Sequence, residues 1–201
     1  MSDFSKTKLQ FHLPKGMIYL DGNSLGPLPK KAQERIQHTL NKEWGEMLVT
    51  GWNKAGWMEQ PNKVGDRIAK LIGATSKTVT VGDTLSIKVF QALASATNYQ
   101  KHRKVLLTDS SNFPSDIYAA QGLVNMLQND YQVKIVSTDD LIDNINENVA
   151  AVFFTEVDYK TGRRYDAKKI IKAAKQSGSL VILDLAHSAG AIDTNLTELE
   201  V

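Results

Sequence analysis

Asp184 and His187 are the residues whose types and spacing best indicate chemistry. They stand three positions apart, where the hydrophobic run 180–183 gives way to small residues. An ionised carboxylate in such a place costs free energy unless a cation or a strong donor pairs with it, and a protonated pyridine nitrogen is such a partner. Taken alone, His187 is equally well interpreted as a structural histidine with satisfied ring nitrogens.

Two further polar segments each follow a predicted strand and open a predicted helix. The first, Gly82–Ser86, offers backbone N–H groups and the positive end of a helix dipole, which suit a phosphate, although a turn that merely caps a helix is commoner. The second segment is Thr108–Asp116. Its Phe113 precedes Pro114 and is therefore extended, so that its ring is able to lie flat against a planar ligand. Asp116 then falls in the first helical turn, where a dipole contact and a hydrophobic staple are the plainer interpretation.

The elements that must position these residues follow from the apolar periodicity. Short β-branched runs alternate with longer amphipathic stretches, which predicts an α/β fold with a mostly parallel sheet and helices on both faces. Ligands of such open sheets bind outside the carboxyl ends of the strands, where all three polar segments fall. The predicted strands are Thr78–Val81, Lys104–Thr108, Gln132–Val136, Ala150–Thr155 and Leu180–Leu185, and the predicted helices are Thr84–Tyr99, Ser115–Asn129, Leu141–Asn146 and Asp166–Ser177.

The first fifty residues are expected to form an arm and a long helix, and residues 51–201 the domain that holds the ligand. Pro29–Val49 is predicted to be amphipathic, with an apolar stripe that faces a core. Tyr19–Pro27 contains two glycines, a proline and small polar residues, and is predicted to be an ordered loop of the kind that carries function. The apolar stripe predicted within Pro29–Val49 consists of Ile36, Leu40, Trp44, Met47 and Leu48.

Composition narrows the function classes. The 201 residues are 42% hydrophobic, and 24 Lys+Arg against 22 Asp+Glu leave a net charge of +2, which excludes disorder and argues against dedicated nucleic-acid or membrane-surface binding. The absence of cysteine removes disulfides, thiolate metal sites and thiol nucleophiles. The sequence has no signal-like start, no run long enough to span a bilayer, and no dinucleotide, P-loop or zincin motif. We therefore expect a cytoplasmic protein with a small-molecule site and no metal.

In order along the chain, these segments resemble the kynureninase family of the bacterial type, in the aminotransferase-like fold type I class of pyridoxal-phosphate enzymes. Asp-x-x-His alone is shared by many fold type I enzymes, whereas the Gly-Asn-Ser-Leu-Gly and Phe-Pro-Ser-Asp pieces together are specific. The resemblance covers nearly the whole chain. It rests on Tyr19–Pro27, Gly51–Trp57, Val81–Phe90, Asn112–Asp116, Thr155–Arg163 and Asp184–Gly190.

The resemblance implies pyridoxal 5′-phosphate as cofactor and a role for each matched residue. Phe113 would stack on the pyridine ring, Asp184 would pair with the ring nitrogen, and His187 would lie near the ring substituents. Asp184 and His187 are therefore the expected catalytic residues. The cofactor-binding residues would be Leu85 and Ser86 at the phosphate, Phe113, Pro114, Ser115 and Asp116 along the ring, and Thr155, Asp184 and His187 at the strand ends. The residues expected near the substrate side chain are Asn23, Ser24 and Trp52.

The activity that the resemblance implies is hydrolysis of L-kynurenine to anthranilate and L-alanine, in tryptophan catabolism and NAD biosynthesis, by a cytoplasmic homodimer. An anionic Asp184 would keep the ring nitrogen protonated, so that the ring accepts electrons from the substrate. Lys88 departs from the family, which commonly has Asn there; the change affects local packing or brings a cation within reach of the phosphate. The family's Schiff-base lysine would lie past Val201. We therefore expect an N-terminal portion with an incomplete large domain, inactive by itself.

Two alternatives stay open. The protein is another fold type I member, such as a cysteine desulfurase-like lyase, although the Gly-Asn-Ser-Leu-Gly and Phe-Pro-Ser-Asp pieces argue against it. Alternatively, it is a non-catalytic fragment that binds a ligand or a partner. A substrate assay separates the first alternative from kynureninase, and a reducible imine with pyridoxal phosphate separates the second.

Overall fold

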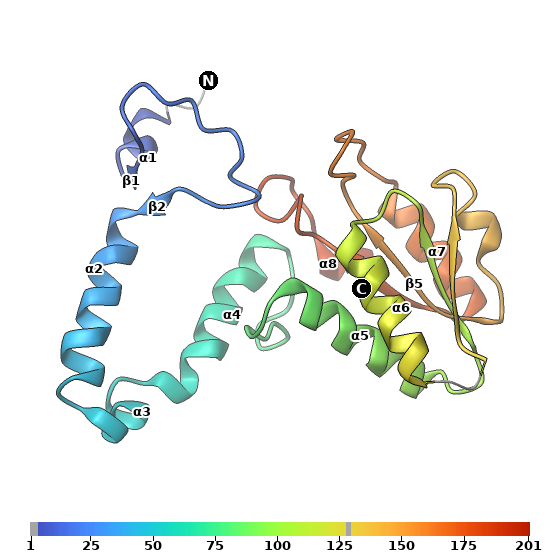
Figure 1. Ribbon diagram of the computed structural model, residues 1–201, viewed down its shortest axis with the longest axis horizontal. Helices are drawn as coiled ribbons and strands as arrows, with labels where there is room; N and C mark the ends of the chain where they lie inside the picture. The colour runs from blue at the N-terminus through green and yellow to red at the C-terminus, as the bar shows by residue number, and fades with distance from the viewer. Residues whose placement is uncertain (1–3, 128–129) are drawn as a thin grey trace. The chain divides into compact units, whose positions relative to one another are not determined.

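The computed structural model describes residues 4–127 and 130–201. The chain divides into two compact units, residues 1–63 and residues 64–201 (Figure 1). The second unit contains the sheet and all the residues that the sequence predicts to bind the cofactor. None of the helices in the described ranges is long and apolar enough to cross a bilayer.

A four-stranded parallel sheet forms the centre of the second unit. Its strands are β3 (Val105–Asp109), β4 (Gln132–Val136), β5 (Val149–Thr155) and β6 (Leu180–Asp184), in the order β4-β3-β5-β6. All three pairs are parallel, so the four carboxyl ends lie at one edge of the sheet. The chain passes from β3 to β4 on one side and returns to β5 on the other, which places the topological switch point between β3 and β5.

Helices cover both faces of this sheet, because its central strands are apolar on both sides. The helices α5 (Leu85–Tyr99), α6 (Pro114–Leu127) and α7 (Ala167–Ser177) lie around β5 (Figure 1). In β5, Phe153 packs with α5 and α6, whereas the next residue, Phe154, packs with α7 on the opposite face. Side chains alternate between faces along a strand, so a continuous hydrophobic run is what a doubly covered strand requires. The predicted α/β fold is confirmed.

The boundaries of these elements follow local signals. The Asp166 carboxylate caps α7 by accepting a hydrogen bond from the Lys169 N–H, and Gly178 ends that helix in the left-handed region at φ 75°. The helix predicted at 141–146 shrinks to the single 3-10 turn η4 (Ile142–Asn144). The predicted end of α6 at Asn129 lies outside the described residues. The other helices of this unit are α4 (Gln60–Leu71), which starts in the first unit, and α8 (Leu196–Leu199).

The strand predicted at Thr78–Val81 is wrong: among the described residues this segment pairs with no other strand. Its backbone instead packs over α4, where a Cβ at Gly65 would collide with the carbonyl oxygen of Val79. A β-branched run favours extended backbone, but a strand also needs a neighbour to complete its hydrogen bonds. The segment therefore stays irregular before α5.

The first unit consists of short elements. The long helix predicted over Pro29–Val49 is confirmed only in part: α2 ends at His38, the helical backbone continues as a π-helical segment, η1, and it ends at Trp44. Gly45 closes that segment with an N–H to Leu40 carbonyl bond, the wider spacing of a π-helix. The elements are α1 (Ser5–Lys8), β1 (Phe11–His12), β2 (Leu28–Pro29), α2 (Lys30–His38), η1 (Thr39–Trp44), η2 (Leu48–Thr50), α3 (Gly51–Lys54) and η3 (Trp57–Glu59).

The apolar stripe of this region does not face a core. Ile36 is 55% exposed, and Trp44 and Leu48 are each 63% exposed. The prediction of a core-facing stripe is therefore wrong for the described chain. Spacing alone places side chains on one face of a helix, but burial needs a second surface against that face.

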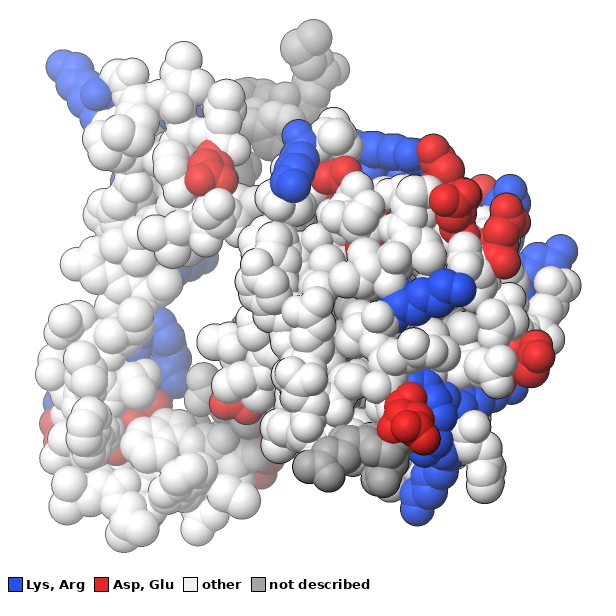
Figure 2. Space-filling model, turned by 45° about the vertical axis from the view of Figure 1, so that its right-hand side comes forward, with Lys and Arg blue, Asp and Glu red and all other residues white. Residues whose placement is uncertain are grey.

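Charged side chains on the second unit are intermixed. On the face shown in Figure 2, Lys and Arg side chains stand beside Asp and Glu side chains around the unit. The ion pairs of this unit include Lys175 with Glu200 at 2.7 Å and Arg163 with Asp139 at 2.9 Å. This face carries no extended patch of one sign.

Candidate functional site

Asp184 ends β6 at the carboxyl edge of the sheet, directly beside Thr155 at the end of β5. It is 7% exposed; its Oδ1 accepts a 2.7 Å hydrogen bond from the Ala186 N–H, and its Oδ2 has no partner among the described residues. Burial raises the pKa of this carboxyl. An unpaired buried carboxylate oxygen is costly, so this atom fits a cationic donor.

Asp116 is a second buried carboxyl at the same edge. It lies in the first turn of α6, is 1% exposed, and accepts a 3.3 Å hydrogen bond from the Ser115 hydroxyl. Burial, assisted by the charge of Asp184, raises the pKa of Asp116 to about 6. Two carboxyl groups that oppose each other's ionisation create a strong preference for positive charge between them.

One cavity joins these two carboxyl groups to the start of α5. Its volume is about 420 Å³, and its walls are mostly apolar, contributed by the sheet and by α4. Leu85, Asp116 and Asp184, three of the predicted site residues, line it together. A mostly apolar cavity with a few convergent polar groups is the usual form of a small-molecule site.

Three rings gather at the ends of β3, β5 and β6. The centroid of Phe113 lies 4.8 Å from that of Tyr159 and 5.9 Å from that of His187, and Tyr159 and His187 lie 6.2 Å apart. The buried His187 Nδ1 has no hydrogen-bond partner in the described chain. The sequence analysis assigned Tyr159 no role; its place in a loop after a strand, inside the segment 155–163 that resembles the family, is the signal by which it could have been found.

The start of α5 offers unbonded donors. Thr84 is extended at ψ 161° and makes no side-chain capping bond within the described chain. The Lys88 N–H is the first to bond one turn back, to the Thr84 carbonyl at 3.0 Å, so the N–H groups of Leu85 and Ser86 have no partner inside the helix. Such a terminus suits a phosphate. The Lys88 ammonium lies 3.9 Å from the Asp83 carboxylate, beside this turn.

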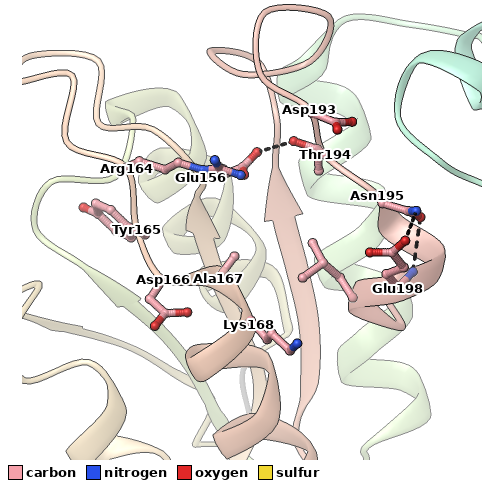
Figure 3. A pocket seen from close by; sticks show the side chains of 11 residues that line it. Glu156, Arg164, Tyr165, Asp166, Ala167, Lys168, Asp193, Thr194, Asn195 and Glu198 are labelled. Carbon is pink, nitrogen blue, oxygen red and sulfur yellow. Dashed lines mark hydrogen bonds and ion pairs between the residues drawn. The ribbon is translucent and has the colours of Figure 1, made fainter.

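A buried glutamate anchors the loop that carries His187. Glu156 is 1% exposed; one of its oxygens accepts from Arg164 Nη2 at 2.9 Å, and the other accepts from the Thr194 hydroxyl at 2.9 Å (Figure 3). Burial by itself raises the pKa of Glu156, but these donors outweigh it and the net pKa is lowered. Glu156 lines a polar cavity of about 360 Å³ and ties the end of β5 to the chain beyond β6. Sequence reasoning missed it.

The three predicted substrate residues belong to the first unit, and their role stays a prediction. Ser24 donates a 2.8 Å hydrogen bond to Asp21 within its own loop. Trp52 meets Trp57 edge to face, with ring centroids 5.9 Å apart. Trp57 is in turn held by a 2.8 Å hydrogen bond from its indole N–H to Glu43.

The carboxyl edge of this α/β sheet therefore carries two buried carboxyl groups, three aromatic rings and unbonded N–H groups at the start of α5, a set of groups that suits a planar ligand with a cationic nitrogen and an anionic group. The chain matches the Aminotransferase class-V family over residues 18–201 and belongs to that family.

Curated relatives confirm the resemblance to kynureninase. The kynureninases of Burkholderia mallei and Pseudomonas fluorescens are each 44% identical to this chain over 192 residues, which cover 93% of this chain and 46% of the relative. The chain thus spans about half the length of the curated relatives it matches.

Solved structures show the same fold at low identity. A cysteine desulfurase from Escherichia coli matches with a TM-score of 0.79 and 15% identity, covering 100% of this chain and 53% of that one. A cysteine desulfurase from Thermococcus onnurineus matches with a TM-score of 0.76 and 18% identity, over 100% of this chain and 52% of that one. These matches establish the fold alone.

Proposed function

We propose that this chain is the cofactor-binding part of a kynureninase, which hydrolyses L-kynurenine to anthranilate and L-alanine with pyridoxal 5′-phosphate. The observation that carries the proposal is the buried Asp184 Oδ2, which has no partner among the described residues and lies at the sheet edge of a chain 44% identical to kynureninases. A pyridinium N–H supplies both the charge and the hydrogen bond that this oxygen lacks.

The residues present fit the cofactor at each of its groups. The N–H groups of Leu85 and Ser86 at the start of α5 suit its phosphate, and Lys88 adds a cation beside them. Phe113, with Pro114 and Ser115 in the same wall, offers a ring face, and Thr155 lies beside Asp184. When bound, pyridoxal phosphate supplies an electron sink for the substrate.

Asp184 and His187 are the proposed catalytic residues of this chain. In an apolar cavity a carboxylate attracts a ring proton far more strongly than in water, because the effective dielectric constant is low. Pairing with that cation lowers the pKa that burial has raised, so Asp184 stays ionised and holds the proton on the ring nitrogen. His187, whose ring is tilted by 32° to that of Phe113, borders the ring substituents, and its Nδ1 has no partner among the described residues.

The substrate, assembly and location belong to the same proposal. An amino acid with an aromatic side chain is the substrate, and Asn23, Ser24 and Trp52 contact that side chain. The protein acts as a homodimer in the cytoplasm, in tryptophan catabolism and NAD biosynthesis. One rival stays open, a cysteine desulfurase-like lyase, since cysteine desulfurases share this fold at 15–18% identity.

A hybrid enzyme tests this proposal. This chain replaces the matched half of the Pseudomonas fluorescens kynureninase, and the hybrid is assayed for anthranilate from L-kynurenine and for alanine from L-cysteine. We expect anthranilate, with most of the activity lost in the Asp184→Ala hybrid. A hybrid that binds pyridoxal phosphate but releases alanine from L-cysteine and no anthranilate would establish the rival.

A further inference from the structure

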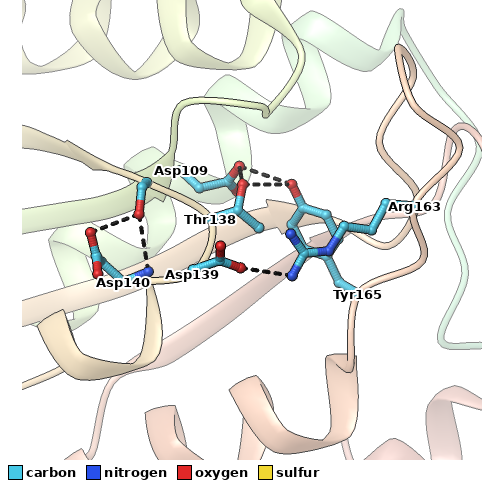
Figure 4. Close-up of polar contacts among 7 residues, drawn as sticks. Asp109, Thr138, Asp139, Asp140, Arg163 and Tyr165 are labelled. Carbon is cyan, nitrogen blue, oxygen red and sulfur yellow. Dashed lines mark hydrogen bonds and ion pairs between the residues drawn. The ribbon is translucent and has the colours of Figure 1, made fainter.

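Asp109 is a buried carboxylate that the proposed function does not use. It is the last residue of β3 and is 0% exposed. Its Oδ1 accepts three hydrogen bonds, from the Ser111 N–H at 2.9 Å, from the Thr138 hydroxyl at 3.1 Å and from the Tyr165 hydroxyl at 2.9 Å (Figure 4). Its Oδ2 is buried without a partner among the described residues.

The three donors come from three different segments at the carboxyl edge. Ser111 follows β3, Thr138 follows β4, and Tyr165 precedes α7, 56 residues from Asp109 in sequence. All three hydrogen bonds converge on one carboxylate oxygen, so they tie the three segments together at Asp109. Losing a hydrogen bond to a buried carboxylate is costly, and the contact therefore holds its donors firmly.

Tyr165 is fixed for this contact. It is 6% exposed, and its ring stacks on Phe154, with centroids 6.3 Å apart and planes at 4°. Burial first, and then the nearby charge of Asp109, raise the pKa of Tyr165 to about 12. The hydroxyl therefore stays protonated at neutral pH and donates a hydrogen bond to Asp109.

A continuous series of hydrogen bonds runs from Asp109 to Phe113. Asn112 donates from its backbone to the Asp109 carbonyl at 3.3 Å and from its side chain to the Thr108 hydroxyl at 3.0 Å. The Phe113 N–H donates to the Asn112 side-chain oxygen at 2.7 Å. The direction in which the chain leaves β3, and so the place of Phe113 and Asp116, depends on the residues around Asp109.

We propose that Asp109, held by Tyr165, is a positioning residue that fixes the segment 110–116 so that Phe113 and Asp116 meet the cofactor. Asp109 does not line the cavity shared by Asp116 and Asp184, so it acts through that segment. The inference rests on the proposed cofactor site.

Hydrogen exchange and cofactor titration of the 201-residue chain test the proposal. Tyr165→Phe removes one donor and keeps the ring stacked on Phe154, and Asp109→Asn keeps the shape and removes the charge. Tyr131→Phe is the control for loss of a tyrosine hydroxyl elsewhere, because it removes a half-buried hydroxyl that contacts the Thr97 carbonyl at 3.5 Å. We expect amide exchange in 110–113 to accelerate about tenfold in Tyr165→Phe, as for the loss of one hydrogen bond to a charged group.

In Tyr165→Phe, amides of β5 should keep their exchange rates. The Kd of the same variant for pyridoxal 5′-phosphate should rise about tenfold, because the same hydrogen bond is lost. Tyr131→Phe should change neither the exchange rates nor the Kd. Unchanged exchange in 110–113, equal acceleration in β5, or an unchanged Kd would each overturn the proposal. If exchange accelerates in 110–113 alone but the unmutated chain binds no pyridoxal phosphate, the proposed function fails while the positioning of the segment by Asp109 is supported.

Discussion

The two units of this chain are ordered by different interactions. In residues 64–201, Leu93 and Phe153 on one face of the sheet and Phe154 on the other face are completely or almost completely buried. In the described part of residues 1–63, no hydrophobic side chain reaches that level, and the buried residues are Glu43 and Gly51. Apolar burial stabilises the second unit, and a polar cluster organises the first.

Glu43 is the centre of that polar cluster. Its carboxylate accepts from Arg35 at 2.6 Å and from the Trp57 indole at 2.8 Å, and the His38 ring nitrogen lies 3.6 Å away. These contacts join α2, η1 and η3 without a hydrophobic core. The contrast shows that an amphipathic stripe becomes a core only when an apolar surface lies opposite it.

Removing a core ring should produce the largest effect. Phe153→Ala in β5 takes away a ring that is 1% exposed between α5 and α6, and we expect a loss of about 3–5 kcal/mol in the free energy of unfolding. Urea denaturation followed by far-UV circular dichroism measures it. A loss below about 1 kcal/mol would show that the sheet unit lacks a close-packed core.

The Asp116 carboxyl should make the sheet unit less stable as pH rises. Its folded pKa, about 6, lies above the reference value of 3.8, so the folded state retains a proton that the unfolded state has lost between those values. Asp116→Asn should match the unmutated chain near pH 4 and be more stable by up to about 3 kcal/mol above pH 6. Denaturation across this range measures the gap, and a constant gap would contradict the assignment.

Breaking the polar cluster should disturb the first unit alone. The hydrogen bond from Arg35, followed by that from Trp57, lowers the pKa of Glu43, so its stabilising contribution is present at neutral pH and lost as pH falls through the acidic range. All three tryptophans lie in residues 1–63, so their emission reports on this unit. Glu43→Gln should shift that emission and speed proteolysis there, whereas Glu46→Gln, in an exposed pair with Lys42, should do neither. Equal effects of the two changes would refute the role of Glu43.

Truncating the exposed stripe should produce the smallest effect. Trp44→Ala removes a side chain that is 63% exposed, and we expect a change within about 0.5 kcal/mol. The same urea titration as for Phe153→Ala provides the comparison. A loss of several kcal/mol would show that the stripe is packed in solution.

The sequence predicts well those features that are determined by neighbouring residues, and poorly those that depend on contacts between distant segments. The runs that became β3, β5 and β6 are apolar on both faces, and parallel strands bring their carboxyl ends to one edge, so Asp116, Asp184 and His187 were expected together. The strand predicted at Thr78–Val81 is wrong, and the helix predicted over 29–49 is too long, because the structure of these segments depends on surfaces that are distant in sequence. Asp109 and Tyr165 are 56 residues apart, so neither signals the other before the chain folds.

The protonation state of the bound ring nitrogen tests the central claim most directly, namely that Asp184 receives a pyridinium N–H. The measurement is the ¹⁵N chemical shift of ring-labelled pyridoxal 5′-phosphate bound to the 201-residue chain and to its Asp184→Ala variant. The account predicts a protonated ring nitrogen at neutral pH with the unmutated chain and an unprotonated one with the variant. The same shift in both proteins would contradict it.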